Sequence, residues 1–402
     1  MFFAPTANRM ARDSAAKAMQ NPPKKFGGDG KCVYLWRANA TLKNYITKAC
    51  EAMIYVKLPE GFAAEEQRLP FFLAMEEFLA RKRDGEYFFM WQVAPTVIFG
   101  RNQRIEAEVN LEFCREKGIQ TCRRKSGGGC VYADRNNIMF SHITTSDAVA
   151  TTFSRFTGEV AAMLRKLGIG DAASSGRNDI LIGDRKVSGY AFYHINLPSG
   201  SGNTPLSRAI VHGTMLYDAD LATMAQAITP SSVKLEAKGV ASVRKHVTTI
   251  REHSSVGLQE FKNFAISHLC DTTITLTSGD IASIREIEQG YYDHNWIYGR
   301  QGQHLATPRR IEGAGEFDIS IGLIPGVPPR IDAIDMTGDF FIMEDLDDRL
   351  FRALHGVELS RNAIIKALHD IDVSHIIHNL SNDAFADLLI QAPDGTPTET
   401  IP

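Results

Sequence analysis

The chain has 402 residues, of which 44% are hydrophobic, and a formal net charge of -3. This length allows an enzyme of two or three domains, and the near-neutral charge argues against a general nucleic-acid binder. No apolar run approaches the roughly 18 residues of a membrane-spanning helix, so we expect no membrane insertion. The six cysteines form no C-x-x-C pair, which favours free thiols in a reducing compartment.

Both ends of the chain differ in composition from its centre. Residues 1–31 are rich in Lys, Arg, Ala and small polar residues, with only Asp13 and Asp29 as acids. This composition is typical of a removable mitochondrial presequence, with a disordered basic tail as the alternative. We therefore expect a mitochondrial location, or a cytoplasmic one if the segment is only a tail. Residues 391–402 resemble a disordered tail.

The first regular elements are predicted between residues 69 and 124. The spacing of Phe71, Met75 and Phe78 predicts a helix over Leu69–Arg83. Further on, the pattern predicts strands at Tyr87–Trp91, Thr96–Phe99 and 119–124, and a helix capped by Asn110 that stops at Gly118.

A glycine-rich stretch follows, in which Arg123 and Arg124 precede Ser126 and the glycines 127–129. Glycines let a ligand approach the backbone closely and allow N–H groups to converge on an anion, while the arginines add fixed positive charge. We expect a cradle for a phosphate or carboxylate, with a flexible hairpin loop as the alternative. The stretch lacks G-x-x-x-x-G-K-[ST] and is therefore not a standard nucleotide-binding loop.

A helix with apolar residues from Phe153 to Leu167 comes next, after a strand over Ile138–Thr144. The dinucleotide-like Gly168–Gly170 follows this helix, so we interpret it as a helix end. Strands Ile180–Ile182 and Lys186–Tyr190 are joined by Gly183–Asp184, which suits a two-residue hairpin. Alternation along a strand puts Lys186 and Ser188 on one face, although an isolated hairpin lysine is usually solvated.

The remaining pattern indicates a second, smaller unit. A strand at Val211–Tyr217, a helix at Asp220–Ile228, a basic loop at Lys234–Arg244 and a helix at 256–269 complete the first unit. Beyond about Gly302 the pattern predicts strands Phe317–Ile324 and Arg330–Asp335 and helices Glu344–Leu354 and Ser360–Leu368. His375 and His378 lack a clear third ligand nearby, so we interpret them as solvated or packed rather than metal-binding.

These motifs, in this order, resemble the lipoate–protein ligase family. Its lipoate-binding signature, catalytic-lysine hairpin, following strand and adenylate-binding loop are similar to Arg123–Gly129, Gly176–Asp179 with Arg185–Gly189, His212–Thr214 and Lys234–Arg244. Trp91–Gln103 also follows the family pattern, and the resemblance covers roughly residues 50–390. It implies an α+β fold with a large mixed-sheet catalytic domain of the lipoate/biotin ligase type, over 32–303, and a small C-terminal α/β accessory domain, over 304–390.

The resemblance also implies a two-step reaction. Lipoate attacks the α-phosphate of ATP to give lipoyl-AMP, and a lysine of an acceptor lipoyl domain then takes the lipoyl group. Mg²⁺ is expected as counter-charge, with unknown ligands. The expected partners are lipoyl domains of 2-oxoacid dehydrogenase complexes and the glycine-cleavage H protein, with no nucleic acid.

The same resemblance assigns the site residues. Lys186 is the expected catalytic residue, acting by position and charge. ATP or the adenylate is expected to contact Arg124, Gly129, Cys130, Val131, Tyr132, Asn137, Asp179, Lys186, Lys238 and Gly239. Lipoate is expected to contact Arg124, Ser126, Gly127, Gly128, Lys186, Ser188, Gly189, Ala191, His212, Gly213 and Thr214. The loop Lys234–Arg244 is expected to order over the adenylate.

Two departures keep alternatives open. Where the family usually has His-Asp-x-Gly-Asn, this chain has Ala133-Asp134-Arg135-Asn136-Asn137. This leaves open a lipoyltransferase that uses lipoyl-AMP or a lipoylated protein as donor and activates lipoate poorly. A cysteine-dependent octanoyltransferase, a biotin ligase and a non-catalytic lipoyl-domain scaffold are further alternatives. The segment His194–Leu206 is also longer than usual and is expected to be a surface excursion.

Overall fold

The computed structural model describes residues 52–82, 85–145, 149–175, 178–197, 206–228, 246–298, 309–343 and 346–392. The predicted presequence, the loop Lys234–Arg244 with Lys238 and Gly239, most of the predicted surface excursion and residues 393–402 lie outside these ranges. Within the described ranges, no helix has the length and apolar character needed to cross a membrane.

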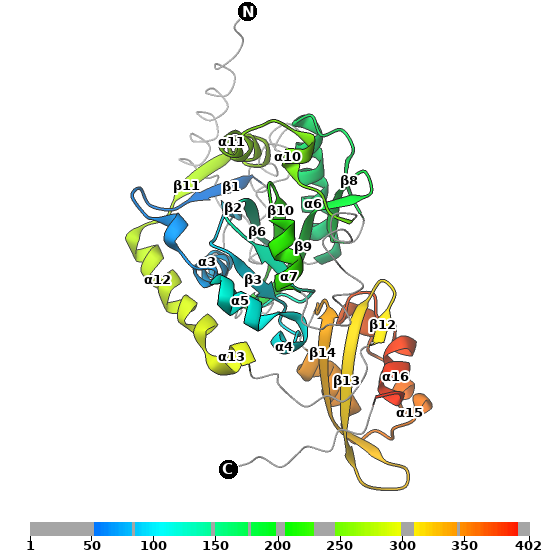
Figure 1. The fold of residues 1–402 in the computed structure, drawn as a ribbon. Helices are drawn as coiled ribbons and strands as arrows, with labels where there is room; N and C mark the ends of the chain where they lie inside the picture. The colour runs from blue at the N-terminus through cyan, green and yellow to red at the C-terminus, as the bar shows by residue number, and fades with distance from the viewer. Residues whose placement is uncertain are drawn as a thin grey trace, which may run out of the picture. The chain divides into compact units, whose positions relative to one another are not determined.

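An eight-stranded mixed sheet forms the centre of the larger domain (Figure 1), in the order β11-β1-β2-β6-β10-β9-β8-β7. Strands β11, β1 and β2 are parallel, and the other neighbours are antiparallel. The strands are β1 (Met53–Lys57), β2 (Glu86–Trp91), β6 (Asn137–Thr145), β7 (Ala172–Ser174), β8 (Asp179–Ile182), β9 (Arg185–Leu197), β10 (Leu206–Leu216) and β11 (Thr272–Thr275).

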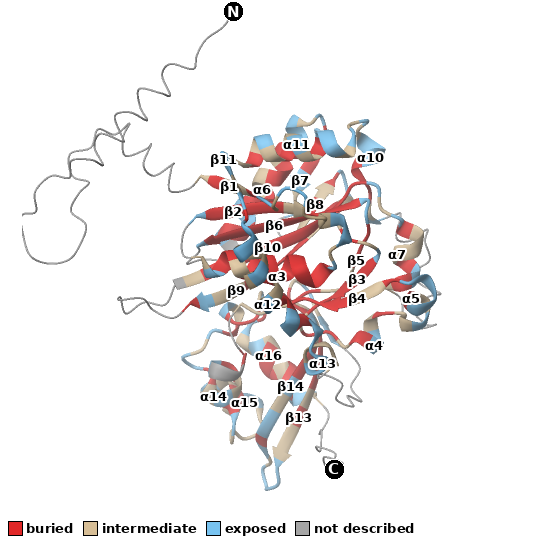
Figure 2. Cartoon of the chain, turned by 90° about the vertical axis from the view of Figure 1, so that its left-hand side faces the viewer, coloured by how far each residue is buried: buried red, intermediate tan, exposed pale blue. Residues whose placement is uncertain are grey.

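Helices cover both faces of this sheet, because its central strands are apolar on both sides. Along β6, Ile138 and Phe140 pack with α6 (Val149–Lys166) and α11 (Leu258–Leu269). Met139 and Ile143, which alternate with them, pack with α3 (Leu69–Arg81) and α12 (Ser278–Glu288). Figure 2 shows the resulting burial, with buried residues along the central strands and exposed ones on the outer helices.

A three-stranded sheet beside the main one fixes the position of the glycine-rich stretch. Strand β3 (Thr96–Phe99) lies between β4 (Gln120–Arg123), which is parallel to it, and β5 (Val131–Ala133), which is antiparallel. The chain must therefore cross the end of β3 to pass from β4 to β5. We call this crossing segment, Arg124–Cys130, the glycine loop.

The helix before β4 follows from local capping signals. Helix α5 (Leu111–Lys117) begins at Asn110, whose side chain accepts a hydrogen bond from Phe113 N at 3.1 Å. It ends at Gly118, whose φ of 65° is left-handed. The short elements of this domain are α4 (Ile105–Glu108), α7 (Leu221–Ala227), α10 (Ile250–His253) and α13 (His294–Tyr298), with 3₁₀ turns at Ala64–Glu66 and Gln289–Tyr292.

The C-terminal domain has its own antiparallel sheet and core. Its strands β12 (Arg309–Ile311), β13 (Gly315–Ile324) and β14 (Arg330–Phe340) pack against the helices, which lie beside the sheet in Figure 1. The helical elements are a π-helical turn at Leu346–Phe351, α14 (Arg352–Leu354), α15 (Arg361–Ala367), a 3₁₀ turn at Val373–His375 and α16 (Asn382–Ile390).

The predicted fold class is confirmed, and the details differ where distant parts of the chain meet. Gly168, with φ of 98°, follows α6, so Gly168–Gly170 is a helix end as predicted. Strand β14 is longer than the predicted Arg330–Asp335 and reaches Phe340, because it pairs with β13 along its whole length. This extension carries the end of β14 to the glycine loop.

Strands β9 and β10 approach closely at Gly213. A Cβ atom added there would lie 2.3 Å from Tyr190 Cδ1 and 2.7 Å from the carbonyl oxygen of Gly189. Tyr190 is the residue directly opposite Gly213 in the sheet. The absence of a side chain therefore lets the buried Tyr190 ring lie across the strand.

We predict opposite effects for the same substitution at two glycines. Gly213→Ala should lower the free energy of unfolding by about 1–3 kcal/mol, because backbone or a buried ring must move. Gly158→Ala, in α6 with no atom within 4 Å of the added Cβ, should be neutral or raise it by up to about 1 kcal/mol. Urea unfolding of both variants measures this, and equal effects would contradict the close packing at Gly213.

Candidate active site

A cavity of about 420 Å³ lies where the glycine loop meets β9 and β10. We call it the ligand cavity. Twelve of the residues predicted to contact ligand line it: Arg124, Gly128, Gly129, Cys130, Val131, Tyr132, Lys186, Gly189, Ala191, His212, Gly213 and Thr214. Leu73, Trp91, Ile98 and Met139 give it an apolar wall. The cavity therefore joins an apolar surface to a cationic and glycine-rich one.

The conformation of the glycine loop is set by the side chain of Arg124. Its Nη2 donates to the carbonyl oxygens of Gly127 at 2.7 Å and Gly129 at 2.8 Å, and its Nη1 donates to that of Ile98 at 3.2 Å. Its Nε donates to Ser126 Oγ at 3.0 Å. The guanidinium thus holds the loop and the end of β3 together, and burial lowers the pKa of Arg124.

Arg123 has a similar structural role, because its side chain binds the backbone of the segment that follows β3. Its Nη1 donates to the carbonyl oxygens of Gly100, Arg101 and Gln103 at 2.7 to 3.2 Å. Its Nη2 donates to Ile297 O at 2.7 Å. The sequence indicated two cations free to face an anion, whereas both guanidinium groups bind backbone carbonyls. Only Arg124 borders the ligand cavity, so an anion contact by Arg124 stays a prediction.

Glycine is required at two points of the crossing. A Cβ atom at Gly100 would lie 2.1 Å from the carbonyl oxygen of Gly128. Gly128 has φ of 87°, and a Cβ atom there would lie 2.9 Å from the Phe341 ring. The loop therefore packs closely on both sides, against the end of β3 and against the C-terminal domain.

Lys186 is the second residue of β9, close to the turn that joins β8 to β9. Its Nζ forms an ion pair with Asp179 Oδ1 at 2.7 Å, and its side chain is 38% exposed. A Cβ atom at Gly189 would lie 2.6 Å from both Lys186 Cε and Nζ, so the lysine lies directly over this glycine. The ammonium is thereby held beside the cavity and remains accessible.

The prediction that Lys186 and Ser188 share a face was wrong. The register shifts between Ile180 and Leu181, so that Leu181 pairs with Lys186 while Ile180 pairs with Ser188. Successive residues of a regular strand face opposite sides, but here an extra residue in β9 makes a β-bulge between Lys186 and Ser188. The bulge breaks the alternation that would have put these two side chains on one face. Ser188 is consequently fully buried and does not line the ligand cavity.

A buried hydrogen-bond chain ties the glycine loop to α3. Ser126 Oγ lies 2.7 Å from His212 Nε2, and His212 Nδ1 lies 2.9 Å from Glu76 Oε2. Ser141 Oγ donates to Glu76 at 2.6 Å and accepts from the Trp91 indole N–H at 2.9 Å. Because buried polar groups must be paired, this chain fixes the loop, β10 and the apolar wall relative to one another.

Some predicted contact residues lie behind the wall of the cavity. Ser126 and Gly127 face the His212 side chain and the carbonyl oxygen of Phe340, respectively. Asn137 donates to the Tyr132 carbonyl at 3.2 Å, and Asp179 does not line the cavity but pairs with Lys186, which does. Lys238 and Gly239 lie outside the described residues.

Two residues of the C-terminal domain belong to the site, and the sequence analysis missed them. The Asp339 Oδ2 atom would lie 2.8 Å from a Cβ atom at Gly129, and the Phe341 ring lies against Gly128. Gly128 N donates to Phe340 O at 3.0 Å. Asp339 and Phe341 also line the ligand cavity, as does Asn178. No local pattern around Asp339 indicates this role, because it depends on contact between segments about 200 residues apart.

Comparison with known proteins assigns both domains to described families. The family described as the lipoyl protein ligase A/B catalytic domain matches residues 70–270, and the bacterial lipoate protein ligase C-terminus matches residues 307–389. The chain is 30% identical to lipoate-protein ligase LplJ of Bacillus subtilis over 330 residues, which are 79% of this chain and 95% of that protein. It is 31% identical to lipoate–protein ligase 1 of Staphylococcus aureus, over 77% and 89% of the two chains.

Solved structures share the fold. P. falciparum LipL1, determined in complex with lipoate, matches with a TM-score of 0.63 at 18% identity, over 84% of this chain and 98% of that one. A bi-partite lipoate protein ligase from Thermoplasma acidophilum, described with its E2 lipoyl domain, matches with a TM-score of 0.53 at 24% identity, over 64% of this chain and 100% of that one.

We predict that Gly128→Val weakens binding in the ligand cavity by at least about tenfold, because a branched side chain at positive φ would displace the loop or Phe341. Gly118→Val is the matched control, since Gly118 also has positive φ but no atom within 4 Å of an added Cβ. Calorimetric titration with a non-hydrolysable lipoyl-adenylate analogue measures the difference. Unchanged binding by folded Gly128→Val protein would mean that the loop is only a connector.

Proposed function

The chain belongs to the lipoate–protein ligase family, and on this premise we propose that it activates lipoate with ATP and transfers the lipoyl group to lysines of acceptor lipoyl domains. The predicted family and enzyme class are confirmed by the matches over both domains. The observation that carries the proposal is the convergence of Lys186, the glycine loop and an apolar wall on one cavity.

The first step joins two anions, and the site has the charge for it. The lipoate carboxylate attacks the α-phosphorus of ATP, and pyrophosphate leaves. Negative charge on the reacting oxygens needs fixed cations and N–H donors, because the chemistry depends on position and electrostatics. The Lys186 ammonium can leave Asp179 to hold the carboxylate and an α-phosphate oxygen together. The Asp179 carboxylate keeps this ammonium in place before the substrates enter.

The apolar wall accounts for the rest of the substrate. Leu73, Ile98 and Met139 line the cavity together with Trp91, whose ring stacks on Phe72 with centroids 4.8 Å apart. An aliphatic chain that ends in a carboxylate matches a cavity that is apolar at one side and cationic at the other. This match supports a medium-chain carboxylic acid as the group that is activated.

The second step requires a protein acceptor. The ε-amine of an acceptor lysine attacks the activated acyl carbon, and AMP leaves. Lipoyl domains are the acceptors that family membership supports. We further propose the lipoyl domains of 2-oxoacid dehydrogenase complexes and the glycine-cleavage H protein as the specific partners.

We propose Mg²⁺ as the counter-ion of ATP. Among the described residues, no group of three or more His, Cys, Asp or Glu side chains is placed to hold a metal ion. Mg²⁺ that enters with a nucleotide takes most of its ligands from phosphates and water, so one or two protein oxygens suffice. Asn137 Oδ1 is buried without a hydrogen-bond partner among the described residues, and Asn137 pairs with Leu216 of the cavity wall. Because Asn137 lies behind the cavity wall, it can reach such an ion only if that wall moves; the ion itself would neutralise phosphate charge.

The departures from the family motif do not disrupt the turn in which they lie. Asp134 Oδ1 accepts hydrogen bonds from Asn136 N at 2.8 Å and Asn137 N at 3.0 Å. Asn136 is not among the described residues with positive φ, so this turn needs no glycine. Ala133 is fully buried in β5. The departures thus leave this turn intact, and the relatives named as lipoate–protein ligases favour the ligase over the lipoyltransferase and scaffold alternatives.

The mitochondrial location remains a prediction, because it depends on residues 1–31. We propose it on the basic and acid-poor composition of that segment. Fractionation of cells that make the full chain and a chain lacking residues 1–31 would test it.

We predict that Lys186→Ala abolishes pyrophosphate release from lipoate, ATP and Mg²⁺, with a loss of at least about 10³-fold, because the only accessible ammonium found on the described cavity wall is removed. Lys166→Ala is the control, since Lys166 is an exposed lysine at the C-terminal end of α6. Pyrophosphate release by the folded Lys186 variant at the unmodified rate would remove Lys186 from the mechanism. Absence of lipoate-dependent release in the unmodified protein, with transfer from supplied lipoyl-AMP, would favour the lipoyltransferase.

A further inference from the structure

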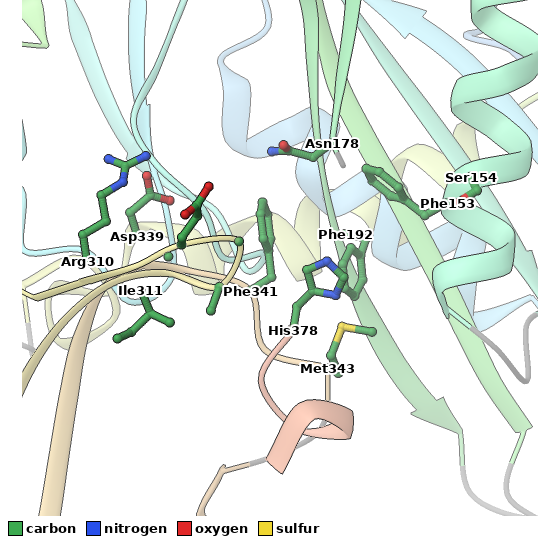
Figure 3. Close-up of a pocket in the computed structure, with 14 residues that line it drawn as sticks. Phe153, Ser154, Asn178, Phe192, Arg310, Ile311, Asp339, Phe341, Met343 and His378 are labelled. Atoms are coloured by element: carbon green, nitrogen blue, oxygen red, sulfur yellow. The ribbon is translucent and has the colours of Figure 1, made fainter. Parts of the chain in front are cut away.

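The glycine loop contacts different parts of the protein along its length. Its glycines lie against Asp339 and Phe341, which Figure 3 shows among the side chains that line a second cavity, of about 620 Å³. The start of the loop is instead held by residues 289–298, which we call the bracing segment. This segment comprises the 3₁₀ turn at Gln289–Tyr292 and α13. None of its residues lines the ligand cavity.

The bracing segment binds Arg123 in both directions. Arg123 Nε and Nη2 donate to Ile297 O at 3.1 and 2.7 Å, and the Trp296 indole N–H donates to Arg123 O at 3.3 Å. Asp293 supports these contacts, since its carboxylate accepts from Trp296 N at 2.9 Å and its carbonyl oxygen accepts from Ile297 N at 3.1 Å. The side chain and the backbone of Arg123 are therefore both fixed directly before the loop begins.

A buried carboxylate holds Lys125, the residue that follows Arg124. Glu77 of α3 is 3% exposed, and its Oε1 lies 2.7 Å from Lys125 Nζ. The Tyr291 hydroxyl donates to the same oxygen at 2.6 Å, and burial, as the largest cause, raises the pKa of Tyr291 so that this hydroxyl keeps its proton. Arg81 is farther from Glu77, at 3.6 Å. The Lys125 ammonium also lies 5.0 Å from the centre of the Tyr291 ring, so it is held by a charge and by an aromatic face.

These anchors lie on both sides of Arg124, whose guanidinium sets the conformation of the glycine loop. Tyr291 and Trp296 pack edge to face, with ring centroids 6.4 Å apart and an interplanar angle of 88°. The anchors of Arg123 and Lys125 therefore form one packed unit. The hydrogen bonds from the Arg124 guanidinium to the loop carbonyls require the backbone at this point to stay in place.

From these contacts we infer that the bracing segment, together with Glu77, holds the glycine loop in the shape that binds the adenylate, and that Lys125 and Trp296 are positioning residues for its formation. The inference rests on the proposed function and adds to it residues that line no part of the ligand cavity. The family models match residues 70–270 and 307–389, so neither of them covers the bracing segment.

The physical reason is that a loop fixed before the ligand arrives loses less conformational freedom when the ligand binds. Its N–H groups then meet negative charge at set positions, and a displacement of about 1 Å is enough to weaken such contacts severely. A loosened bracing segment should therefore weaken binding although every side chain of the ligand cavity is kept. A role in stability alone would lower the fraction of folded protein and leave the affinity of the folded fraction unchanged.

The first test removes the Lys125 ammonium and keeps the length of its side chain. Lys125→Met should raise the Kd of a non-hydrolysable lipoyl-adenylate analogue about tenfold in calorimetric titration, with unchanged stoichiometry. Lys125→Arg keeps a cation that stacks on aromatic rings, and its Kd should stay within about twofold of that of the unmodified protein. Lys117→Met is the matched control, because Lys117 is exposed and lies over the Phe113 ring of α5 at 6.0 Å without lining the ligand cavity.

Calorimetry measures the affinity and the fraction of binding-competent protein separately. An unchanged Kd in folded Lys125→Met, a loss of stoichiometry alone, or equal weakening in Lys117→Met would overturn the positioning role of Lys125. Failure of the unmodified protein to bind the analogue and to release pyrophosphate from lipoate and ATP would contradict the proposed function, and this inference with it.

The second test asks whether Lys125 acts through Glu77. Glu77→Gln keeps the shape of the side chain and an oxygen that accepts from Tyr291, but it removes the charge that attracts the ammonium. Groups that act as one unit are not additive. Lys125→Met added to Glu77→Gln should therefore raise the Kd by less than about twofold further. A further tenfold rise would show that the ammonium acts elsewhere and would overturn the inference.

The third test follows the loop itself. Trp296→Phe keeps a ring against Tyr291 but removes the N–H that binds Arg123 O. Hydrogen exchange of the loop amides, measured without ligand, should become about three- to tenfold faster, and the KM for ATP in pyrophosphate release should rise with it. Tyr298→Phe, which removes a hydroxyl from the same helix, is the control. Equal loop exchange in the two variants would show that α13 does not hold the loop.

Discussion

The hydrogen bonds of the Arg124 guanidinium are the interaction on which the site depends. A buried positive charge is costly unless its donors are satisfied, and here four hydrogen bonds reach carbonyl and hydroxyl oxygens of the loop and of β3. The need to satisfy these donors determines how the loop crosses β3. That crossing in turn brings Gly128 and Gly129 to the ligand cavity and to the C-terminal domain.

The buried chain of Glu76, His212 and Ser126 supports the same loop from the other side. Its order of carboxylate, imidazole and hydroxyl matches that of a hydrolytic triad, but its setting does not. Ser126 is fully buried and its oxygen also accepts from Arg124 Nε, so the hydroxyl has no route to a substrate carbonyl. These hydrogen bonds therefore make the site rigid, and the chemistry is carried out by groups on the cavity wall.

The sequence was sufficient where structure depends on near neighbours. Helix α5 was bounded correctly because its cap at Asn110 and its stop at Gly118 are local signals, and the two strands around Gly183 follow from a two-residue turn. The side of the sheet that Ser188 faces was predicted wrongly, because the β-bulge in β9 depends on pairing between strands. The roles of Arg123 and Asp339 could not be predicted from the sequence either, since Arg123 donates to Ile297 O and Asp339 lies against Gly129. Both contacts join segments far apart in the chain.

The position of Trp91 gives the protein a built-in optical signal. The chain has three tryptophans, and Trp36 lies outside the described residues. Trp91 lines the ligand cavity with its indole N–H bonded to Ser141, whereas Trp296 lies outside that wall and donates to Arg123 O at 3.3 Å. Indole emission responds to the polarity and motion of its surroundings, so an acyl chain that displaces water from the cavity alters the fluorescence of Trp91. Occupancy can thus be followed in the unlabelled protein.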